Sequence, residues 1–407
     1  MNHELSERSN GQPPPLSTTW RAGALIVMVT IAASLSCCQS EKSPRESGRA
    51  GRKEGRTAPG PGPAADTASP VSAVNGEISV FFSNAYANNP KVGENDPNNI
   101  DRHLADVITH ARSTVDCAFF ELKCERIAAA LIAAKQRGVR VRLVADSDFR
   151  EDAEMQEVLA ARIPVVFDER SAFMHDKFVI ADAVLVWTGS YNATDNCSYR
   201  NNNNALLLHS AELAENYTAE FEEMFNDGKF GPRSPSATPH SFVKLGDADV
   251  YNYFGPEDEP QTKILRFLKA AKQSVHFLAF SFTDQDIGSV LVERHQNGVQ
   301  VEGVVERRNS DARGAQMGPL MAAGIPVLQD GNTYVMHHKV FVIDGTWTIT
   351  GSYNFTSSGA NQNDENVLVI RSPAVARAFE GEYQRIKRMA QQSPVVHVNA
   401  RAGATNQ

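Results

Sequence analysis

Residues 335–354 read Val-Met-His-His-Lys-Val-Phe-Val-Ile-Asp-Gly-Thr-Trp-Thr-Ile-Thr-Gly-Ser-Tyr-Asn, and this stretch decides the fold because the chain contains it twice. The earlier copy, residues 173–192, reads Phe-Met-His-Asp-Lys-Phe-Val-Ile-Ala-Asp-Ala-Val-Leu-Val-Trp-Thr-Gly-Ser-Tyr-Asn. Equivalent residues stand 162 positions apart, as His175 and His337 do. The sequence therefore predicts an internal duplication.

Each copy has the pattern of a buried hairpin. Side chains two apart in a strand point to the same face, so His337 and Lys339 are expected to project together. Asp344-Gly345 is a strong signal for a two-residue turn, and apolar runs flank it on both sides. The stretch is thus predicted to present an imidazole beside an ammonium group.

The composition is that of a soluble globular protein. Of 407 residues, 42% are hydrophobic and 22% are charged, which is enough to bury one or two sizeable cores. The formal net charge of −8 gives no support to a large electropositive surface for nucleic acid. Five cysteines in a chain of this length do not indicate a disulfide-rich scaffold.

The N-terminal segment is predicted to be a targeting signal. Residues 22–36 form an uncharged apolar run that is shorter than the roughly 20 residues a permanent spanning helix needs. Cys37 and Cys38 follow the run, which resembles a bacterial lipoprotein signal, while plain export and an uncleaved anchor remain alternatives. We therefore expect a signal peptide over 1–38, and an extracytoplasmic protein that is either membrane-tethered or secreted.

The remaining chain divides into two α/β halves. Residues 39–75 are rich in Ser, Pro, Gly and Arg and are expected to be a disordered linker, as is the tail 393–407. The halves are expected at 76–228 and 242–392, separated by a Gly- and Pro-rich joint at 226–241. Predicted strands are 78–82, 115–120, 139–145, 275–282 and 299–305, and predicted helices are 100–113, 125–137, 151–161, 211–225, 262–271 and 286–296.

These alternating elements predict two pseudo-symmetric α-β-α halves with mixed sheets. Gly298 follows Gly138 by 160 positions, so the repeat persists well outside the hairpins. Because no single hairpin supplies two histidines and two lysines, a site that uses all four must lie where the halves meet.

The order His-x-Lys, then Asp after four further residues, then Gly-Ser-x-Asn resembles the motif of the phospholipase D superfamily. Both copies are complete, and the resemblance covers about residues 77–390. The matching residues are His175, Lys177, Asp182, Gly189, Ser190 and Asn192 in the first copy, and His337, Lys339, Asp344, Gly351, Ser352 and Asn354 in the second.

The resemblance implies phosphodiester chemistry without a metal ion or cofactor. One histidine would attack phosphorus to form a phosphohistidine, and the other would protonate the departing alkoxide and later deprotonate water. Lys177, Lys339, Asn192 and Asn354 would hold the non-bridging oxygens. Asp182 and Asp344, at the hairpin turns, are expected to orient the backbone and not to act as acids, with Ser190 and Ser352 as further supporting residues.

The two copies differ at one informative position. Glu365 follows His337 by 28 residues and matches a family acid that hydrogen-bonds the imidazole, whereas the same step from His175 reaches Asn203. A carboxylate at the second ring nitrogen favours imidazolium, and an amide does not. The hypothesis is therefore that Glu365 keeps His337 protonated as the general acid and that His175 is the nucleophile.

Other candidates carry weaker signals. A metal site at His175-Asp176 or His337-His338 is disfavoured because the adjacent lysine repels cations. Alternatives stay open for the other groups. Cys117 and Cys124 fit a zinc site, a disulfide or, more readily, buried thiols, and Cys197 is left unassigned. Asp146, Glu306, Arg307 and Arg308 fit the mouth of the site or solvated loop ends; Phe173, Met174, Tyr334, Val335 and Met336 fit an apolar leaving-group contact or core packing.

Phospholipid is the favoured substrate. A membrane tether, an acidic chain and the lack of a basic–aromatic stripe favour hydrolysis of headgroup esters to phosphatidic acid and an alcohol. The alternative is an exported, metal-independent endonuclease, because the short halves resemble that branch of the superfamily. A phosphatidyl transferase and a non-catalytic binding module are the remaining readings. Since one chain supplies both halves, a monomer is sufficient.

Overall fold

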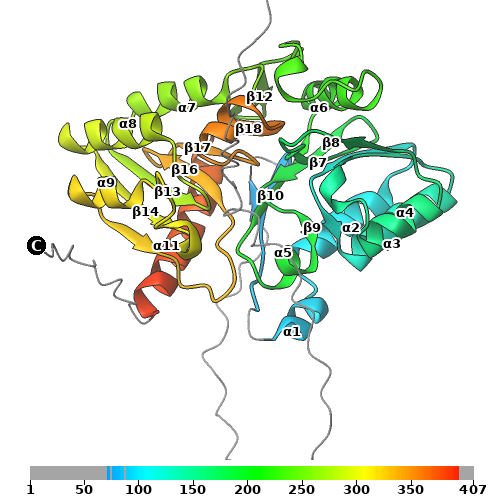
Figure 1. Ribbon diagram of the computed structural model, residues 1–407, viewed down its shortest axis with the longest axis horizontal. Coiled ribbons are helices and arrows are strands. Elements are labelled where there is room, and N and C mark those ends of the chain that lie inside the picture. The colour runs from blue at the N-terminus through cyan, green and yellow to red at the C-terminus, as the bar shows by residue number, and fades with distance from the viewer. Residues whose placement is uncertain (1–70, 74–75, 87–88, 394–407) are drawn as a thin grey trace, which may run out of the picture. The chain divides into compact units, whose positions relative to one another are not determined.

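The computed structural model describes residues 71–73, 76–86 and 89–393 (Figure 1). The predicted signal peptide, nearly all of the linker and nearly all of the tail lie outside these residues. Strand β1 (Val71–Ala73) pairs antiparallel with β2 (Ile78–Phe82). The linker boundary predicted at residue 75 is therefore wrong, because residues at its C-terminal end already belong to the first sheet.

Two eight-stranded mixed sheets form the fold, and their strand orders correspond position by position. The first sheet runs β1, β2, β10 (Asn204–His209), β8 (Leu185–Gly189), β7 (Lys177–Ala181), β3 (Thr114–Phe119), β5 (Arg140–Asp146) and β6 (Val165–Asp168). The second runs β11 (Phe242–Leu245), β12 (Ala248–Gly255), β18 (Glu365–Arg371), β17 (Trp347–Gly351), β16 (Lys339–Ile343), β13 (Ser274–Ala279), β14 (Gln300–Val305) and β15 (Val327–Gln329). The predicted class of two pseudo-symmetric α/β halves is confirmed.

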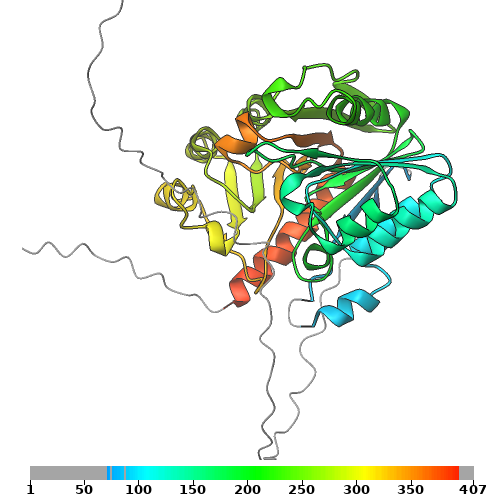
Figure 2. The same cartoon turned by 45° about the vertical axis from the view of Figure 1, so that its right-hand side comes forward.

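Helices cover both faces of each sheet (Figures 1 and 2). The outer layers contain α2 (Ile100–His110), α3 (Glu125–Gln136) and α4 (Ala153–Ala160) in the first half, and α7 (Pro260–Lys269), α8 (Gln285–Gln296) and α9 (Met317–Ala322) in the second. Shorter elements are α1 (Pro90–Asn95), α5 (Asp195–Tyr199), α10 (Ser357–Asn361), and the paired strands β4 (Leu122–Lys123) and β9 (Ala193–Thr194). Helix α1 lies in a segment for which the sequence predicted neither a helix nor a strand.

The inner faces of the two sheets share one core. Helix α6 (Ala211–Phe225) packs on its own sheet and on β12 of the second half, while α11 (Pro373–Gln392) packs on its own sheet and on β1 and β2 of the first. A single buried apolar cluster runs through both helices and both sheets. Both helices begin in the same way, because the hydroxyls of Ser210 and Ser372 cap the third amide of each.

The hairpins β7–β8 and β16–β17 are held at their turns by the motif aspartates. Asp182 and Asp344 have φ of +53° and +52°, as a type I′ turn requires. The Asp182 carboxylate accepts hydrogen bonds from the backbone amides of Arg112, Ser113 and Thr114. Asp344 accepts them from residues 272–274 in the same way. These carboxylates therefore fix each hairpin to the loop ahead of the central strand.

The motif glycines are required by the close approach of neighbouring strands. Gly189 and Gly351 have φ of +149° and +148°, where side chains are rarely tolerated. A Cβ atom at Gly189 would lie 2.4 Å from the Asn204 carbonyl oxygen, and one at Gly351 would lie 2.1 Å from that of Asn366. The glycines thus let β10 and β18 pass directly beside the motif serines.

Replacing Asp182 by Asn is expected to destabilise the fold. Partial burial of the carboxyl opposes ionisation, but the amides of Arg112, Ser113 and Thr114 lower the pKa of Asp182 to about 2. A carboxylate with a lowered pKa stabilises the fold above pH 4, and this contribution is lost as the pH falls toward 2. Because the turn is partly exposed, we expect the variant to lose about 1 kcal/mol at pH 7.

Urea unfolding at pH 7 and at pH 3 measures this effect. The difference between Asp182→Asn and the parent protein should shrink at pH 3. Asp247→Asn, in the exposed β11–β12 turn, is the matched control and should unfold like the parent at both values. An equal loss in both variants would show that the carboxylate at Asp182 has no special role.

Candidate active site

Each motif histidine is fixed by backbone from the other half. The His175 amide donates to the Asp364 carbonyl at 3.0 Å, and the Asp364 amide donates to the Phe173 carbonyl at 3.0 Å. The His337 amide donates to the Asn202 carbonyl at 2.9 Å, and the Asn202 amide donates to the Val335 carbonyl at 2.8 Å. Both histidines are therefore held where the halves meet. The sequence predicted this position, because a site that uses both histidines and both lysines needs both halves.

The imidazoles have unequal partners. His175 Nδ1 lies 2.8 Å from Glu365 Oε2, whereas His337 Nδ1 lies 2.9 Å from both Asn203 Oδ1 and the Ser190 carbonyl. The sequence-based pairing of Glu365 with His337 is therefore wrong. The crossed backbone contacts bring the start of β18 next to His175 and the start of β10 next to His337, so each partner serves the histidine of the other half.

The motif serines orient these partners. Ser352 Oγ donates to Glu365 Oε2 at 2.6 Å and accepts from the Asn366 amide at 2.9 Å. Ser190 Oγ donates to Asn203 Oδ1 at 3.1 Å and accepts from the Asn204 amide at 3.0 Å. The Asn203 Nδ2 group donates to the Cys197 carbonyl, which turns the amide oxygen toward His337. Each serine thus holds the group that contacts an imidazole.

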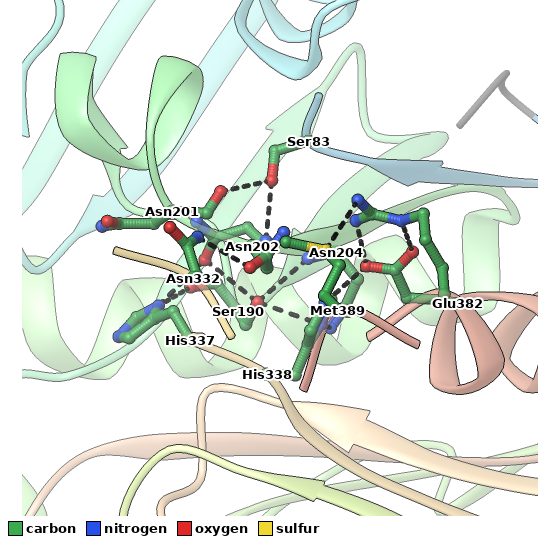
Figure 3. A network of polar contacts seen from close by, with 12 residues as sticks. Ser83, Ser190, Asn201, Asn202, Asn204, Asn332, His337, His338, Glu382 and Met389 are labelled. Atoms are coloured by element: carbon green, nitrogen blue, oxygen red, sulfur yellow. Dashed lines mark hydrogen bonds and ion pairs between the residues drawn. The ribbon is translucent and has the colours of Figure 1, made fainter. Parts of the chain in front are cut away.

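The four consecutive asparagines 201–204 are buried in one polar network at the seam (Figure 3). Ser83 Oγ donates to the Asn201 carbonyl at 2.6 Å and accepts from the Asn203 amide at 2.7 Å. Asn332 Nδ2 donates to Asn202 Oδ1 at 2.7 Å, across the two halves. The network therefore satisfies most of a run of buried amides, with Asn201 Oδ1 and Asn202 Nδ2 left unpartnered within the described part of the chain, and fixes the strand that supports His337.

The motif lysines and two phenylalanines surround the histidines symmetrically. Lys177 Nζ donates to the His175 carbonyl at 2.6 Å, and Lys339 Nζ donates to that of His337 at 2.8 Å. The Phe120 ring lies 4.8 Å from the His175 ring and 5.0 Å from Lys177 Nζ. Phe280 repeats this arrangement at 4.7 Å from both His337 and Lys339.

Phe120 and Phe280 were not predicted as site residues. They are separated by the same 160 positions as Gly138 and Gly298, so the repeat itself carried the signal. An edge-on aromatic ring keeps water from the imidazole and supports the ammonium group through its π face.

Burial controls the charges at the site. The exposed fractions of His175 and His337 are only 6% and 7%. Burial, together with Lys177 and Lys339, lowers the pKa of both histidines well below the usual value, and burial raises the pKa of Glu365 to about 8. The expectation that His337 rests protonated is therefore wrong for the unliganded site. Both imidazoles favour the neutral form that can act as nucleophile or base.

The motif asparagines lie just beyond the hairpins. Asn192 and Asn354 follow Ser190 and Ser352 by two residues, and both retain a buried amide oxygen with no hydrogen-bond partner among the described residues. Because the Ser190 carbonyl contacts His337 and the Ser352 hydroxyl contacts Glu365, both asparagines continue segments that already reach the site.

Several residues considered for the mouth of the site are structural. Asp146 and Glu306 are buried, and they accept the backbone amides of Met174 and Met336 at 3.1 and 2.7 Å. They therefore hold the residue before each histidine. Arg307 and Arg308 donate to the carbonyls of Asn332 and Thr333 and support the loop before His337.

Core packing accounts for Met174, Val335 and Met336, which are buried. Phe173 and Tyr334 remain half-buried. Phe173 lies 5.3 Å from Phe120, which in turn lies 4.8 Å from Phe149, so three aromatic rings stand together beside His175. Asn309 stands at the equivalent of Phe149 in the second half, 160 positions on.

The residues following the histidines point away from the imidazoles, as strand alternation requires. Asp176 accepts from Asn366 at 2.7 Å, and His338 lies between Asn204 and Glu382, 2.9 Å from each. Neither neighbour forms a metal pair with its motif histidine. Cys117, Cys124 and Cys197 are buried free thiols. None of the helices that the structure describes has the length and apolar character needed to cross a membrane.

The lowered pKa of His337 predicts a pH-dependent stability. Below pH 6.5 the unfolded histidine binds a proton that the folded one does not, so its contribution to stability is lost as the pH falls. From pH 6.5 to 5.5 the parent protein should lose about 1 kcal/mol more than His337→Gln, whose partner Asn203 does not titrate. Urea unfolding at the two pH values measures the difference, and equal losses would contradict it.

Comparison with known proteins identifies the family. The family described as "Cardiolipin synthase, PLD-like domain" matches residues 104–225 and 264–387. Mitochondrial cardiolipin hydrolase of Xenopus tropicalis is 32% identical over 129 residues, which are 32% of this chain and 61% of that protein. Phospholipase D of Rickettsia prowazekii is 28% identical over 162 residues, which are 40% of this chain and 79% of that protein.

A solved structure extends the likeness of fold to both halves. Phosphatidylserine synthase of Haemophilus influenzae aligns with a TM-score of 0.57 over 80% of this chain and 89% of that one, at 14% identity. The chain spans between about half and three fifths of the cardiolipin hydrolases that it matches. Its two matched segments together exceed half of its own length. With both motif copies joined in one site, the chain belongs to the phospholipase D superfamily, in the family of cardiolipin synthase-type, phospholipase D-like domains.

Proposed function

We propose that the protein is a phosphodiesterase that hydrolyses phospholipid headgroup esters to phosphatidic acid and an alcohol, with His175 as the nucleophile. The observation that carries this assignment is the unequal partnering of the imidazoles. His175 contacts a carboxylate, Glu365, while His337 contacts two neutral oxygens. A symmetric pair of motifs thereby acquires two different chemical roles.

In the first step, His175 Nε2 attacks phosphorus. In the form with Glu365 ionised, whose share grows as the pH rises toward its pKa of about 8, Nδ1 donates to the carboxylate and the Nε2 lone pair is available. As the P–N bond forms, the P–O bond to the alcohol breaks and positive charge develops on the ring. The Glu365 carboxylate stabilises that charge, as carboxylates do in other histidine mechanisms.

His337 handles the leaving group and the water. Its Nδ1 faces two acceptors and so carries a hydrogen, which leaves Nε2 for proton transfer. A bound phosphodiester anion offsets the charges of Lys177 and Lys339, which raises the pKa of His337 and lets Nε2 hold a second proton. That proton goes to the departing alkoxide. The neutral ring then takes a proton from water, whose oxygen displaces the histidine and breaks the P–N bond.

The lysines and asparagines stabilise the charge on phosphorus. Lys177 and Lys339 are buried against the carbonyls of the two histidines, so a phosphate between the imidazoles meets two fixed ammonium groups. Asn192 and Asn354 add amide donors at the ends of both motifs. Charges fixed before the reaction stabilise the trigonal-bipyramidal state without reorganisation.

Lipid is supported by the aromatic group beside the nucleophile. Phe120, Phe149 and Phe173 form one apolar surface next to His175, suited to the glycerol and acyl region of a phospholipid. The relatives named cardiolipin hydrolase and phospholipase D point the same way. An N-terminal lipoprotein-type tether, which we also propose, would hold the enzyme at the membrane. An endonuclease remains the second candidate because aromatic side chains can also stack with nucleobases.

Substrate class is tested with the purified chain in chelating buffer. Vesicles of phosphatidylcholine, phosphatidylglycerol or cardiolipin are compared with single- and double-stranded DNA. We expect lipid cleavage that His175→Ala reduces at least 10³-fold, because removing the nucleophile leaves only binding effects. His110→Ala, an exposed histidine on α2, is the control and should retain full activity. Cleavage of DNA alone would reject the lipid assignment.

The roles of the histidines are tested by trapping the intermediate. In His337→Asn, water activation is lost, while a phosphodiester with an activated leaving group such as p-nitrophenol needs no general acid, so its phosphoryl group is expected to accumulate on His175 and to be mapped there by mass spectrometry. Glu365→Gln should slow turnover by about 10²–10⁴-fold because the developing imidazolium loses its counter-charge. Asn203→Ala, the counterpart in the other half, should slow it less. Phosphate on His337 in a His175→Asn protein would reverse the assignment.

A further inference from the structure

Helices α6 and α11 are equivalent in the two halves, and their matching residues lie 162 positions apart. Each carries a buried acid at the interface between the halves, but only the acid on α11 has charge-balancing partners. In the second half, Glu382 is buried between His338 Nε2 at 2.9 Å and the Arg385 guanidinium at 2.7 Å (Figure 3). Burial opposes ionisation, but Arg385 and His338 lower the pKa of Glu382 to about 2. A buried carboxylate is tolerated here because the Arg385 guanidinium balances its charge and His338 Nε2 lies within hydrogen-bond distance, while burial lowers the pKa of His338 itself.

The first half has no such balance. Glu220 stands at the position of Glu382, but Asp176 replaces His338 and Glu223 replaces Arg385. The turn after β12 of the second half adds a fourth acid, Glu257. One carboxylate oxygen each from Glu220, Glu223 and Glu257 lies within 4.8 Å of the other two. Acids therefore gather where the pseudo-symmetric site holds an arginine and a histidine.

Several oxygens of this group are buried without a partner. Asp176 is fully buried; its Oδ1 accepts from Asn366, but its Oδ2 has no hydrogen-bond partner. Glu223 Oε1 and both Glu257 carboxylate oxygens are also buried and unpartnered. The charge of Asp176 is one of the causes that raise the pKa of Glu220, Glu223 and Glu257, and its equivalent in the second half, His338, contacts Glu382. Leaving such groups ionised and uncompensated is costly, so they need either bound protons or a cation.

We propose that Glu220, Glu223 and Glu257 bind a divalent cation, which takes the place of the Arg385 charge and joins α6 of the first half to the β12–α7 turn of the second. A ligand set made only of carboxylate oxygens suits Ca²⁺, Mg²⁺ or Mn²⁺, with no nitrogen or sulfur donor to select Zn²⁺. The cation is structural, because its ligands are distinct from the residues that contact the substrate. The inference does not rest on the proposed function.

Protons are the competing source of neutralisation. Burial raises the pKa of Glu223 to about 7 and that of Glu257 to about 8, so these carboxyls can also hold hydrogens. The two states differ in one measurable respect: only the cation makes the unfolding temperature depend on divalent ion concentration.

Thermal unfolding of the full chain after chelator treatment, followed by titration with Ca²⁺, Mg²⁺ or Mn²⁺ at pH 8, tests the proposal. A saturating cation should raise Tm by about 5 °C. Glu257→Gln should abolish the response. Glu223→Arg, which restores the residue type of the other half, should raise Tm without cation and remove the response. Glu212→Gln, an exposed residue on the same helix, is the control and should respond like the parent.

Two results would overturn the proposal. One is the absence of any Tm shift and of any calorimetric binding of the three cations to the parent protein. The other is a shift that persists unchanged in both Glu257→Gln and Glu223→Arg, since the cation would then bind elsewhere. Phosphodiesterase activity well below Tm should survive chelation in every sample, so a failure of the cation site remains distinct from a failure of the catalytic assignment.

Discussion

The exchange of backbone hydrogen bonds between the halves is the constraint on which the site depends. The His175 amide binds the Asp364 carbonyl, and the His337 amide binds the Asn202 carbonyl. Neither imidazole can take up its position unless the other half is folded and docked. The shared apolar core between the inner sheet faces stabilises the association of the two halves. The exchanged amide hydrogen bonds fix how the halves are aligned with each other.

This exchange also explains the polar character of the seam. Carrying two backbone segments across an interface buries many amides, which must all be satisfied. Asn203, Asn204 and the motif serines satisfy many of them with side chains that both donate and accept. The motif glycines belong to the same solution, because the strands pass too close for a Cβ. Much of the motif therefore serves the docking of the halves as well as the chemistry.

Most of the architecture could be predicted from the sequence. The duplicated hairpin, the alternation of strands and helices and the offset of about 160 residues led to two pseudo-symmetric α/β halves with a joint site. The pairing of Glu365 could not be predicted in this way. Sequence spacing relates residues within one half. The hydrogen bonds exchanged between the halves instead bring Glu365 to His175, which belongs to the other half. Helix α1 was missed because its six residues include proline, glycine and asparagine, which carry little helical signal.

The contrast between Glu365 and Asn203 has a consequence for how such a site can arise. A two-fold dimer of a single half would have to place the same residue against both imidazoles, so nucleophile and acid would be interchangeable. When the halves are joined in one chain, the residues against the two imidazoles no longer have to be the same. Each copy can then mutate independently, and a reaction centre with a fixed direction can evolve from parts that were once equal.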